Sequence, residues 1–141
     1  MKTVVAIIQA RMGSTRLPGK VLADVNGKPM LKWLLDRIKA VKEVDKIVVA
    51  TTINSEDDIL ETWLLDNNVA CFRGNEIDVL DRFYHCAKSR LAELIVRVTA
   101  DDPLKDPGII SQAIAKIRGN DSIDYCSNTI NTSFSLTYPV F

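Results

Sequence analysis

Short runs of apolar residues, rich in Val and Ile, alternate along the chain with longer stretches in which apolar residues recur every three or four positions. The short runs predict buried strands, and the longer stretches predict helices with one apolar side. Strands that alternate with helices are typical of a parallel α/β sheet. The predicted strands cover residues 4–8, 47–51, 69–72 and 94–98, and residues 124–126 are a candidate fifth.

Two of the predicted helices have starts that can be located. Pro29 suits the first position of a helix whose apolar residues continue to Val41. Ser55 with Asp58 resembles a capping box, and the run of residues 56–58 places favourable negative charge in a first helical turn. The stripe expected to be buried on this second helix consists of Ile59, Leu60, Trp63 and Leu64.

Aspartates precede the other two helical patterns. Asp78 is positioned to cap a helix that continues to Ala87, and Asp106 with Pro107 forms a cap followed by a first-turn proline. Residues 127–141 are rich in Asn, Thr and Ser and show no clear period, which favours a loop. Because no repeat or linker interrupts the pattern, residues 1–141 are interpreted as a single domain.

Composition narrows the possible functions. Hydrophobic residues make up 47% of the chain, which excludes intrinsic disorder. Lys and Arg number 18 and Asp and Glu also number 18, so the formal net charge is zero. A neutral chain has no global attraction for nucleic acid or an anionic membrane, and we expect neither as a partner. Any anion-binding site must therefore be a local cluster of cations.

Targeting and cysteine signals are also weak. No apolar run approaches the ~20 residues that span a bilayer, and the apolar stretch at the N-terminus is too short for a signal peptide. The three cysteines form no CxxC pair, which argues against a disulfide framework or a zinc site. We expect a cytoplasmic protein.

The strongest chemical signal is the loop that follows the first predicted strand. It contains two glycines, several hydroxyls and the cations Arg11, Arg16 and Lys20, while the first acidic residue of the chain is Asp24. Ligands of open α/β sheets bind at the carboxyl ends of the strands, where backbone N–H groups and Arg side chains can hold phosphate oxygens. The alternative is a solvated basic loop, which the position after the first strand makes less favourable.

Two common nucleotide motifs are excluded for this loop. The spacing from Gly13 to Lys20 is one residue too long for a Walker A loop, and Val21 stands where a Ser or Thr would bind magnesium. The chain also lacks a GxGxxG sequence, which disfavours a dinucleotide-binding fold.

The loop and several later segments resemble the cytidylyltransferases that activate acidic sugars, such as CMP-ketodeoxyoctonate and CMP-sialate synthetases. Within that group the chain is most similar to the spore-coat polysaccharide biosynthesis protein F type. The supporting segments are IQARMGSTRLPGK at residues 8–20, GKPM at 27–30, VVATT at 48–52, RGN at 73–75, DVLDRF at 78–83, VRVTADDPL at 96–104 and DP at 106–107.

The resemblance implies a nucleotide-diphospho-sugar transferase fold, a three-layer Rossmann-like sheet with mostly parallel strands and helices on both faces. It also implies that a sugar hydroxyl attacks the α-phosphorus of CTP and that pyrophosphate leaves. Arg11, Lys20 and Asp101 take the catalytic positions. The residues that the resemblance places on the nucleotide are Ala10, Arg11, Gly13, Ser14, Arg16, Lys20, Thr51 and Arg82.

Two adjacent carboxylates, Asp101 and Asp102, follow the predicted strand at residues 94–98. Mg²⁺ prefers carboxylate, water and phosphate oxygens, so a carboxylate at the end of a strand suits a magnesium site. Adjacent residues of an extended chain point in opposite directions, so only one should face the nucleotide. The resemblance makes Asp101 the metal ligand, and Asp102 before Pro103 is favoured as a turn residue.

The chain differs from its relatives at the C-terminal end. Related enzymes are longer, and their C-terminal part supplies much of the sugar pocket, a dimer contact and a second metal carboxylate. Tyr138-Pro139 is not followed here by the Gly-Leu-Asp stretch that is common in such relatives. The expected partners are CTP and a sugar, and a homodimer is one expected assembly. The alternatives are a non-catalytic or partner-dependent nucleotide-binding domain, and a nucleotidyltransferase that uses UTP or GTP.

Overall fold

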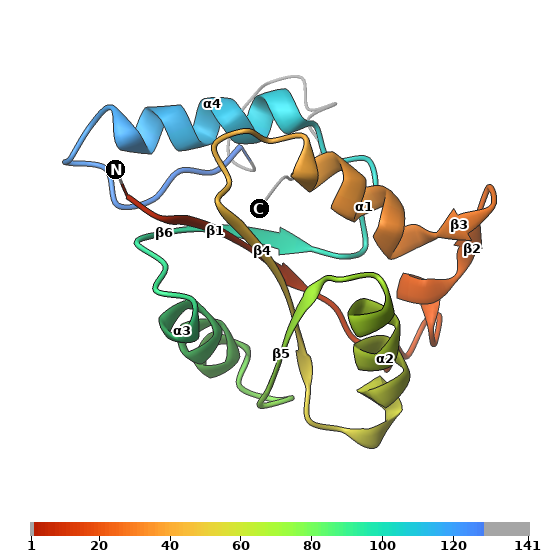
Figure 1. The fold of residues 1–141 in the computed structure, drawn as a ribbon. Helices are drawn as coiled ribbons and strands as arrows, with labels where there is room; N and C mark the ends of the chain where they lie inside the picture. The colour runs from red at the N-terminus through yellow and green to blue at the C-terminus, as the bar shows by residue number, and fades with distance from the viewer. Residues whose placement is uncertain (1, 129–141) are drawn as a thin grey trace.

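Four parallel strands form the central sheet of the computed structural model, which describes residues 2–128 (Figure 1). Their order is β5-β4-β1-β6, so the first strand of the chain lies inside the sheet. The strands are β1 (Val4–Gln9), β4 (Lys46–Thr52), β5 (Ala70–Gly74) and β6 (Leu94–Thr99). All four predicted strands are present. β1 and most of β4 are buried on both faces, whereas β5 is half-buried along its length and β6 leaves Ile95 exposed.

Four helices cover the sheet on both sides, as the three-layer prediction requires. Helices α1, α2 and α4 supply buried residues to the core on one face, and α3 supplies them on the other. The α/β fold is therefore confirmed. The helices are α1 (Met30–Lys39), α2 (Asp58–Asp66), α3 (Val79–Ser89) and α4 (Pro107–Arg118).

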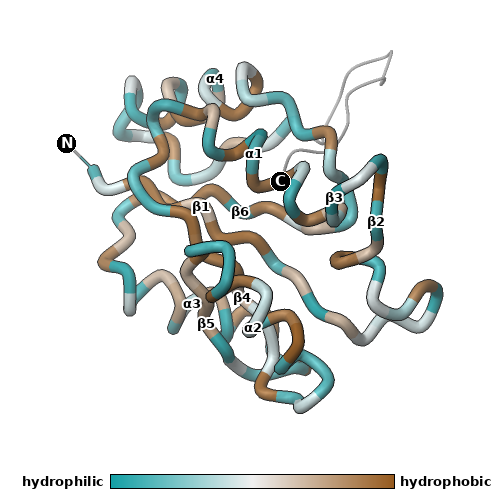
Figure 2. Tube along the Cα trace, turned by 45° about the vertical axis from the view of Figure 1, so that its right-hand side comes forward, coloured by the Kyte–Doolittle hydropathy of each residue, from teal (hydrophilic) through white to brown (hydrophobic). Residues whose placement is uncertain are grey.

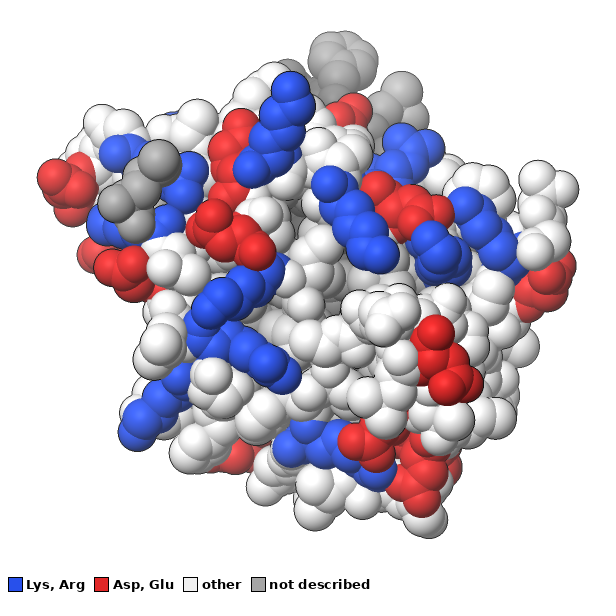
Figure 3. Space-filling model, viewed as in Figure 1, with Lys and Arg blue, Asp and Glu red and all other residues white. Residues whose placement is uncertain are grey.

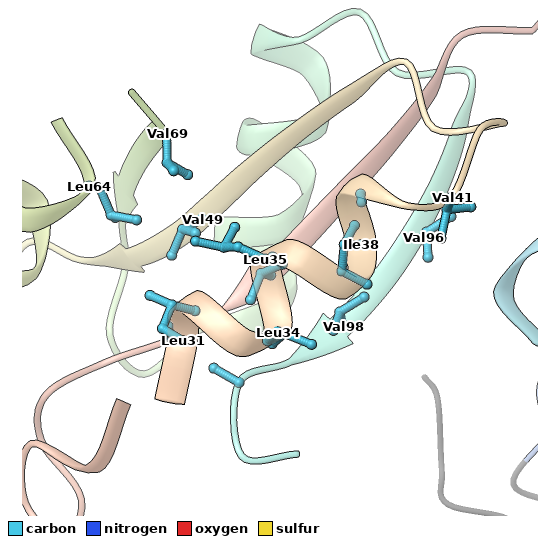
Figure 4. Packing of buried hydrophobic residues seen from close by; sticks show 14 of the residues in the cluster. Leu31, Leu34, Leu35, Ile38, Val41, Val49, Leu64, Val69, Val96 and Val98 are labelled. Carbon is cyan, nitrogen blue, oxygen red and sulfur yellow. The ribbon is translucent and has the colours of Figure 1, made fainter. Parts of the chain in front are cut away.

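The larger part of the core lies between α1 and the sheet. Leu34 and Ile38 of α1 pack with Val98 of β6 in one cluster of buried side chains (Figure 4). Figure 2 shows the same distribution along the chain, with hydrophobic segments concentrated in the central strands. Burial of an aliphatic side chain of this size contributes about 1.5–3 kcal/mol, so this layer holds the strand ends in fixed positions.

Both predicted aspartate caps are confirmed. Asp78 Oδ1 accepts the N–H of Asp81 at 2.9 Å, and Asp106 Oδ1 accepts the N–H of Gly108 at 2.7 Å. Pro107 occupies the first turn of α4, as its position after the cap predicts. Such caps satisfy N–H groups that a helix start cannot pair internally.

The predicted start of α2 is wrong. Asn54 precedes a short 3-10 helix, η2 (Ser55–Asp57), and neither η2 nor α2 has a side-chain cap hydrogen bond. Ile59, expected to be buried, is 60% exposed, because it lies beside the face of α2 that Leu60 and Leu64 present to the core. Leu60 and Leu64 are buried as expected.

Residues 124–126 and Pro29 differ from expectation, and one further prediction is untested. Residues 124–126 form no strand in the part of the chain that the structure describes, and most of the loop predicted for residues 127–141 lies outside it. Pro29 precedes α1 instead of starting it, because it closes a small hairpin of β2 (Asp24–Val25) and β3 (Lys28–Pro29). Asn26 and Gly27 at the hairpin tip both have positive φ, as a tight Asn-Gly turn requires.

None of the helices in residues 2–128 is long and apolar enough to cross a membrane. The short 3-10 helix η1 (Lys20–Leu22) connects the loop after β1 to the hairpin. The loop thus runs from a central strand into a helical turn.

Replacing Asp106 by Ala should lower the free energy of unfolding by about 1 kcal/mol, because two N–H groups of α4 lose their acceptor. Urea denaturation measures the change. Ser55→Ala is the matched control and should cost less than about 0.5 kcal/mol, since no capping box is present at that position. Equal losses in the two variants would contradict the observed cap at Asp106.

Candidate functional site

The loop after β1 is closed at its base by one residue, Met12. The Met12 carbonyl accepts the N–H of Gly19 at 2.8 Å, and the Met12 N–H donates to Asp57 Oδ1 at 2.6 Å. Gly19 has a φ of 71°, in the left-handed region that glycine adopts at low cost. These contacts hold residues 13–18 as a closed loop at the carboxyl end of β1.

Parallel pairing brings the second chemical segment to the same place. Strand β1 pairs in parallel with β6, and Gln9 lies opposite Thr99 at the carboxyl ends of the two strands. The loop after β1 and the segment that contains Asp101 therefore leave the sheet side by side. This is the edge at which open α/β sheets bind ligands.

A cavity of about 250 Å³ lies between these two segments. It brings together the residues predicted from the loop and Asp101, but it contains neither Thr51 nor Arg82. Its polar character and small volume suit phosphate groups better than an apolar ligand. The lining residues are Gln9, Ala10, Arg11, Gly13, Ser14, Thr15, Arg16, Lys20, Val21, Thr99, Ala100 and Asp101.

Charge is arranged locally around this cavity. Figure 3 shows cationic and anionic side chains interspersed over the face it displays, in keeping with the zero net charge. Arg11, Arg16 and Lys20 all line the cavity, and Arg11 Nη1 lies 3.6 Å from Glu76 Oε1 at its rim. The concentration of three cations on one loop matches the expectation of a local anion site.

Asp101 is held in its ionised form. A hydrogen bond from the Thr99 hydroxyl is the largest cause that lowers the pKa of Asp101, and the positive charge of Lys20 lowers it further. An ionised carboxylate opposite a loop of cations can bind a metal ion that also contacts phosphates.

Asp102, in contrast, does not line the cavity. Its Oδ1 accepts the N–H of Leu104 at 3.0 Å, and its Oδ2 lies 3.2 Å from the buried Lys105 Nζ. These contacts are those of a turn residue. The two adjacent carboxylates thus occupy different environments.

Arg82 lies in a second cavity, of about 400 Å³, that adjoins the first. Its side chain is buried, and its Nη1 donates to the carbonyl of Asn75 at 2.6 Å. Burial lowers the pKa of Arg82, with a smaller contribution from the charge of Arg11. Gln9 and Arg11 line both cavities, and Glu76, Ile77 and Val79 complete the second.

Gln9 is a site residue that the sequence analysis missed. Its Oε1 is buried and has no hydrogen-bond partner among residues 2–128, so it is an acceptor available to a ligand. The available signal was a polar residue directly after the apolar run of the first strand. Thr51, which was predicted, is fully buried at the end of β4 and lines neither cavity.

Asp57 is a second residue whose role was missed. The sequence predicts favourable charge in a helix first turn, yet the side chain is fully buried. Its carboxylate binds Met12 and accepts both the N–H and the hydroxyl of Thr52. It therefore joins the cationic loop to the end of β4.

A third hollow and two of the cysteines lack the chemistry of a phosphate or metal site. A larger apolar groove of about 640 Å³ runs along β6 between α3 and α4, away from the cationic loop. Burial raises the pKa values of Cys71 and Cys86 to about 11, so neither thiol is a nucleophile at neutral pH. In the described part of the chain, no group of three or more His, Cys, Asp or Glu side chains could hold a metal by itself.

Comparison with known proteins decides the family. Residues 5–137 match the cytidylyltransferase family. The chain belongs to the cytidylyltransferases. It is 40% identical over 118 residues to the spore coat polysaccharide biosynthesis protein SpsF of Bacillus subtilis, covering 81% of this chain and 49% of that protein. The expected membership of the cytidylyltransferase family is therefore confirmed.

Solved structures agree with the cytidylyltransferase assignment. A cytidylyltransferase from Leptospira borgpetersenii superimposes with a TM-score of 0.88 at 36% identity, covering 95% of this chain and 57% of that one. A CMP:2-keto-3-deoxy-manno-octonic acid synthetase complexed with CTP gives a TM-score of 0.78 at 26% identity, covering 86% and 49%. The cytidylyltransferase chain described here spans about half the length of the curated relatives it matches.

Replacing Thr99 by Val should raise the pKa of Asp101 more than Lys20→Met does, because the Thr99 hydroxyl is the larger cause of its lowering. The contribution of ionised Asp101 to stability is present above the unfolded value of 3.8 and is lost as the pH falls through the lower folded pKa. NMR titration of the side-chain carboxyl carbon measures both variants. A larger rise in Lys20→Met would show that charge dominates instead.

Proposed function

We propose that this cytidylyltransferase transfers CMP from CTP to an acidic sugar and releases pyrophosphate. The observation that carries the proposal is the cavity in which Arg11, Lys20 and Asp101 converge at the carboxyl ends of β1 and β6. The name of the CTP-bound structural relative supports an acidic sugar, and the name of SpsF supports a role in surface polysaccharide synthesis. We further propose a cytoplasmic location, where CTP is made, and a homodimer as the assembly.

We assign the triphosphate to the cavity of about 250 Å³ and the base to the adjoining cavity of about 400 Å³ that contains Arg82. Gln9 and Arg11 form the shared wall, so a nucleotide can cross from one cavity to the other. Cytosine carries an amino donor next to two acceptors. The buried Oε1 of Gln9 supplies an acceptor, and the guanidinium of Arg82 supplies donors.

The reaction needs little covalent chemistry from the protein. A sugar hydroxyl loses its proton to water and forms a bond to the α-phosphorus, the bond to the bridging oxygen breaks, and pyrophosphate leaves with that electron pair. Positioning and neutralisation of the phosphate charge account for most of the catalysis in such transfers. We assign these roles to Arg11, Arg16 and Lys20, with N–H groups of Gly13 and Ser14 directed at phosphate oxygens.

Mg²⁺ is the proposed cofactor, and the residues present fit it. Asp101 offers an ionised carboxylate on the wall opposite the cationic loop. Magnesium is commonly held by one or two carboxylates together with substrate phosphates and water, which suits a site with one such side chain. When bound, the ion would neutralise charge on the phosphates.

Two alternatives remain distinguishable by experiment. A nucleotide-binding domain without turnover would bind CTP but release no pyrophosphate when acidic sugars are added. An enzyme specific for UTP or GTP would bind those nucleotides more tightly than CTP in a competition experiment. The unpartnered Oε1 acceptor of Gln9 favours cytosine over uracil, because uracil presents a carbonyl where cytosine has its amino group.

Replacing Lys20 by Ala should weaken CTP binding by roughly 10- to 150-fold, the loss expected for one charge-assisted contact of about 1.5–3 kcal/mol. Isothermal titration calorimetry measures the affinity. Lys42→Ala is the matched control, since Lys42 is exposed and lies before β4, at the opposite end of the sheet. Unchanged affinity in Lys20→Ala would mean that the loop does not hold the triphosphate.

Replacing Asp101 by Asn should abolish most of the gain in CTP affinity that magnesium provides, because the amide keeps the shape but loses the charge. Asp102→Asn should retain that gain, since Asp102 contacts Leu104 and Lys105 instead of the cavity. CTP titrations with and without magnesium compare the two variants. Equal effects would show that the wrong carboxylate has been assigned to the metal.

A further inference from the structure

The cationic loop, residues 11–20, is anchored through the backbone of Met12. Its carbonyl accepts the N–H of Gly19, and its own N–H donates to Asp57. Both backbone groups of Met12 are therefore held in place. The Met12 side chain also packs against the main core. The direction in which the loop leaves β1 therefore depends on the group that accepts the Met12 N–H.

That acceptor is a buried carboxylate from another part of the chain. Asp57 is fully buried, its Oδ1 lies 2.6 Å from the Met12 nitrogen, and its Oδ2 lies 3.2 Å from the Thr52 nitrogen. The Thr52 hydroxyl donates to the same Oδ2. A buried charge is tolerated when several donors satisfy it, and the position of Asp57 directly before α2 adds a favourable helix dipole.

The same anchor reaches towards the second cavity. Thr52 is followed by Ile53, whose N–H donates to the carbonyl of Gly74 at 3.1 Å. A Cβ atom on Gly74 would lie 2.9 Å from the Cγ of Arg82, so Arg82 packs directly against this backbone. Asp57 thus connects the loop to the structure that supports Arg82.

We propose that Asp57 is the positioning residue of the phosphate-binding loop, fixing it through the Met12 N–H in the conformation that binds a polyphosphate. This inference rests on the proposed function, and Asp57 acts through Met12 without touching the nucleotide. Asparagine at this position keeps the shape but replaces one acceptor oxygen with a donor. Either Met12 or Thr52 then faces an N–H group, and the charge that attracts three donors is gone.

The test uses inorganic tripolyphosphate, a probe that needs the loop but not the base cavity. Asp57→Asn is expected to bind it about 10-fold more weakly than the unchanged protein, the effect of one hydrogen bond to a charged group. Thr52→Val is the matched control, because it removes a hydroxyl that binds the same carboxylate but leaves the Met12 contact in place. It should keep tripolyphosphate affinity within about twofold, while urea denaturation reports the stability of both variants.

A second measurement needs no substitution. A ligand that binds only the ordered loop stabilises that state, so saturating tripolyphosphate should slow hydrogen exchange at the Met12 amide of the unchanged protein. Full affinity in a folded Asp57→Asn protein, equal weakening in Thr52→Val, or unaltered exchange at Met12 would each overturn the proposal. If the unchanged protein binds neither tripolyphosphate nor CTP, the proposed function itself fails, which is a different result.

Discussion

The parallel pairing of β1 with both of its neighbours is the constraint on which the site depends. Because β1 lies between β4 and β6, the carboxyl ends of all three strands meet at one edge of the sheet. Three segments distant in sequence leave the sheet there: the cationic loop, the turn that contains Asp57 and the turn that contains Asp101. An antiparallel neighbour would have sent one of these segments to the opposite edge.

Buried polar side chains are concentrated at this edge of the sheet, whereas the rest of the interior formed by residues 2–128 is apolar. The main core is aliphatic, whereas Thr51, Thr52, Asp57 and Arg82 are buried near the strand ends. Buried polar groups cost free energy unless they find partners, so they persist where the surrounding contacts supply those partners or where a ligand does. Asp57 has its partners within the fold, whereas Gln9 Oε1 has none among residues 2–128 and is open to a ligand.

Sequence patterns correctly predicted the features that depend on residues close together in the chain. The four strands and the caps at Asp78 and Asp106 depend on residues next to one another, and all are present in the structure. The role of Asp57 was not predictable in this way, because its partner Met12 lies 45 residues earlier and its carboxylate is an ordinary choice for a first helical turn. The burial of Ile59 was predicted wrongly, because the face of α2 that meets the core is narrower than expected and carries Leu60 and Leu64 but not Ile59.

A chain with zero net charge can still hold a strong local anion site. Its cation Arg11 is paired with the acidic Glu76, which a ligand can replace. The Arg11–Glu76 pair is 3.6 Å long and both side chains are substantially exposed, so its net contribution is about 0–1 kcal/mol. A triphosphate offers several negative charges and bidentate oxygens to the same guanidinium, which makes a stronger contact than one exposed carboxylate. In the proposed binding mode, phosphate would therefore replace Glu76 on Arg11. Glu76 would then be free at the edge of the cavity that contains Arg82, to which we assign the base.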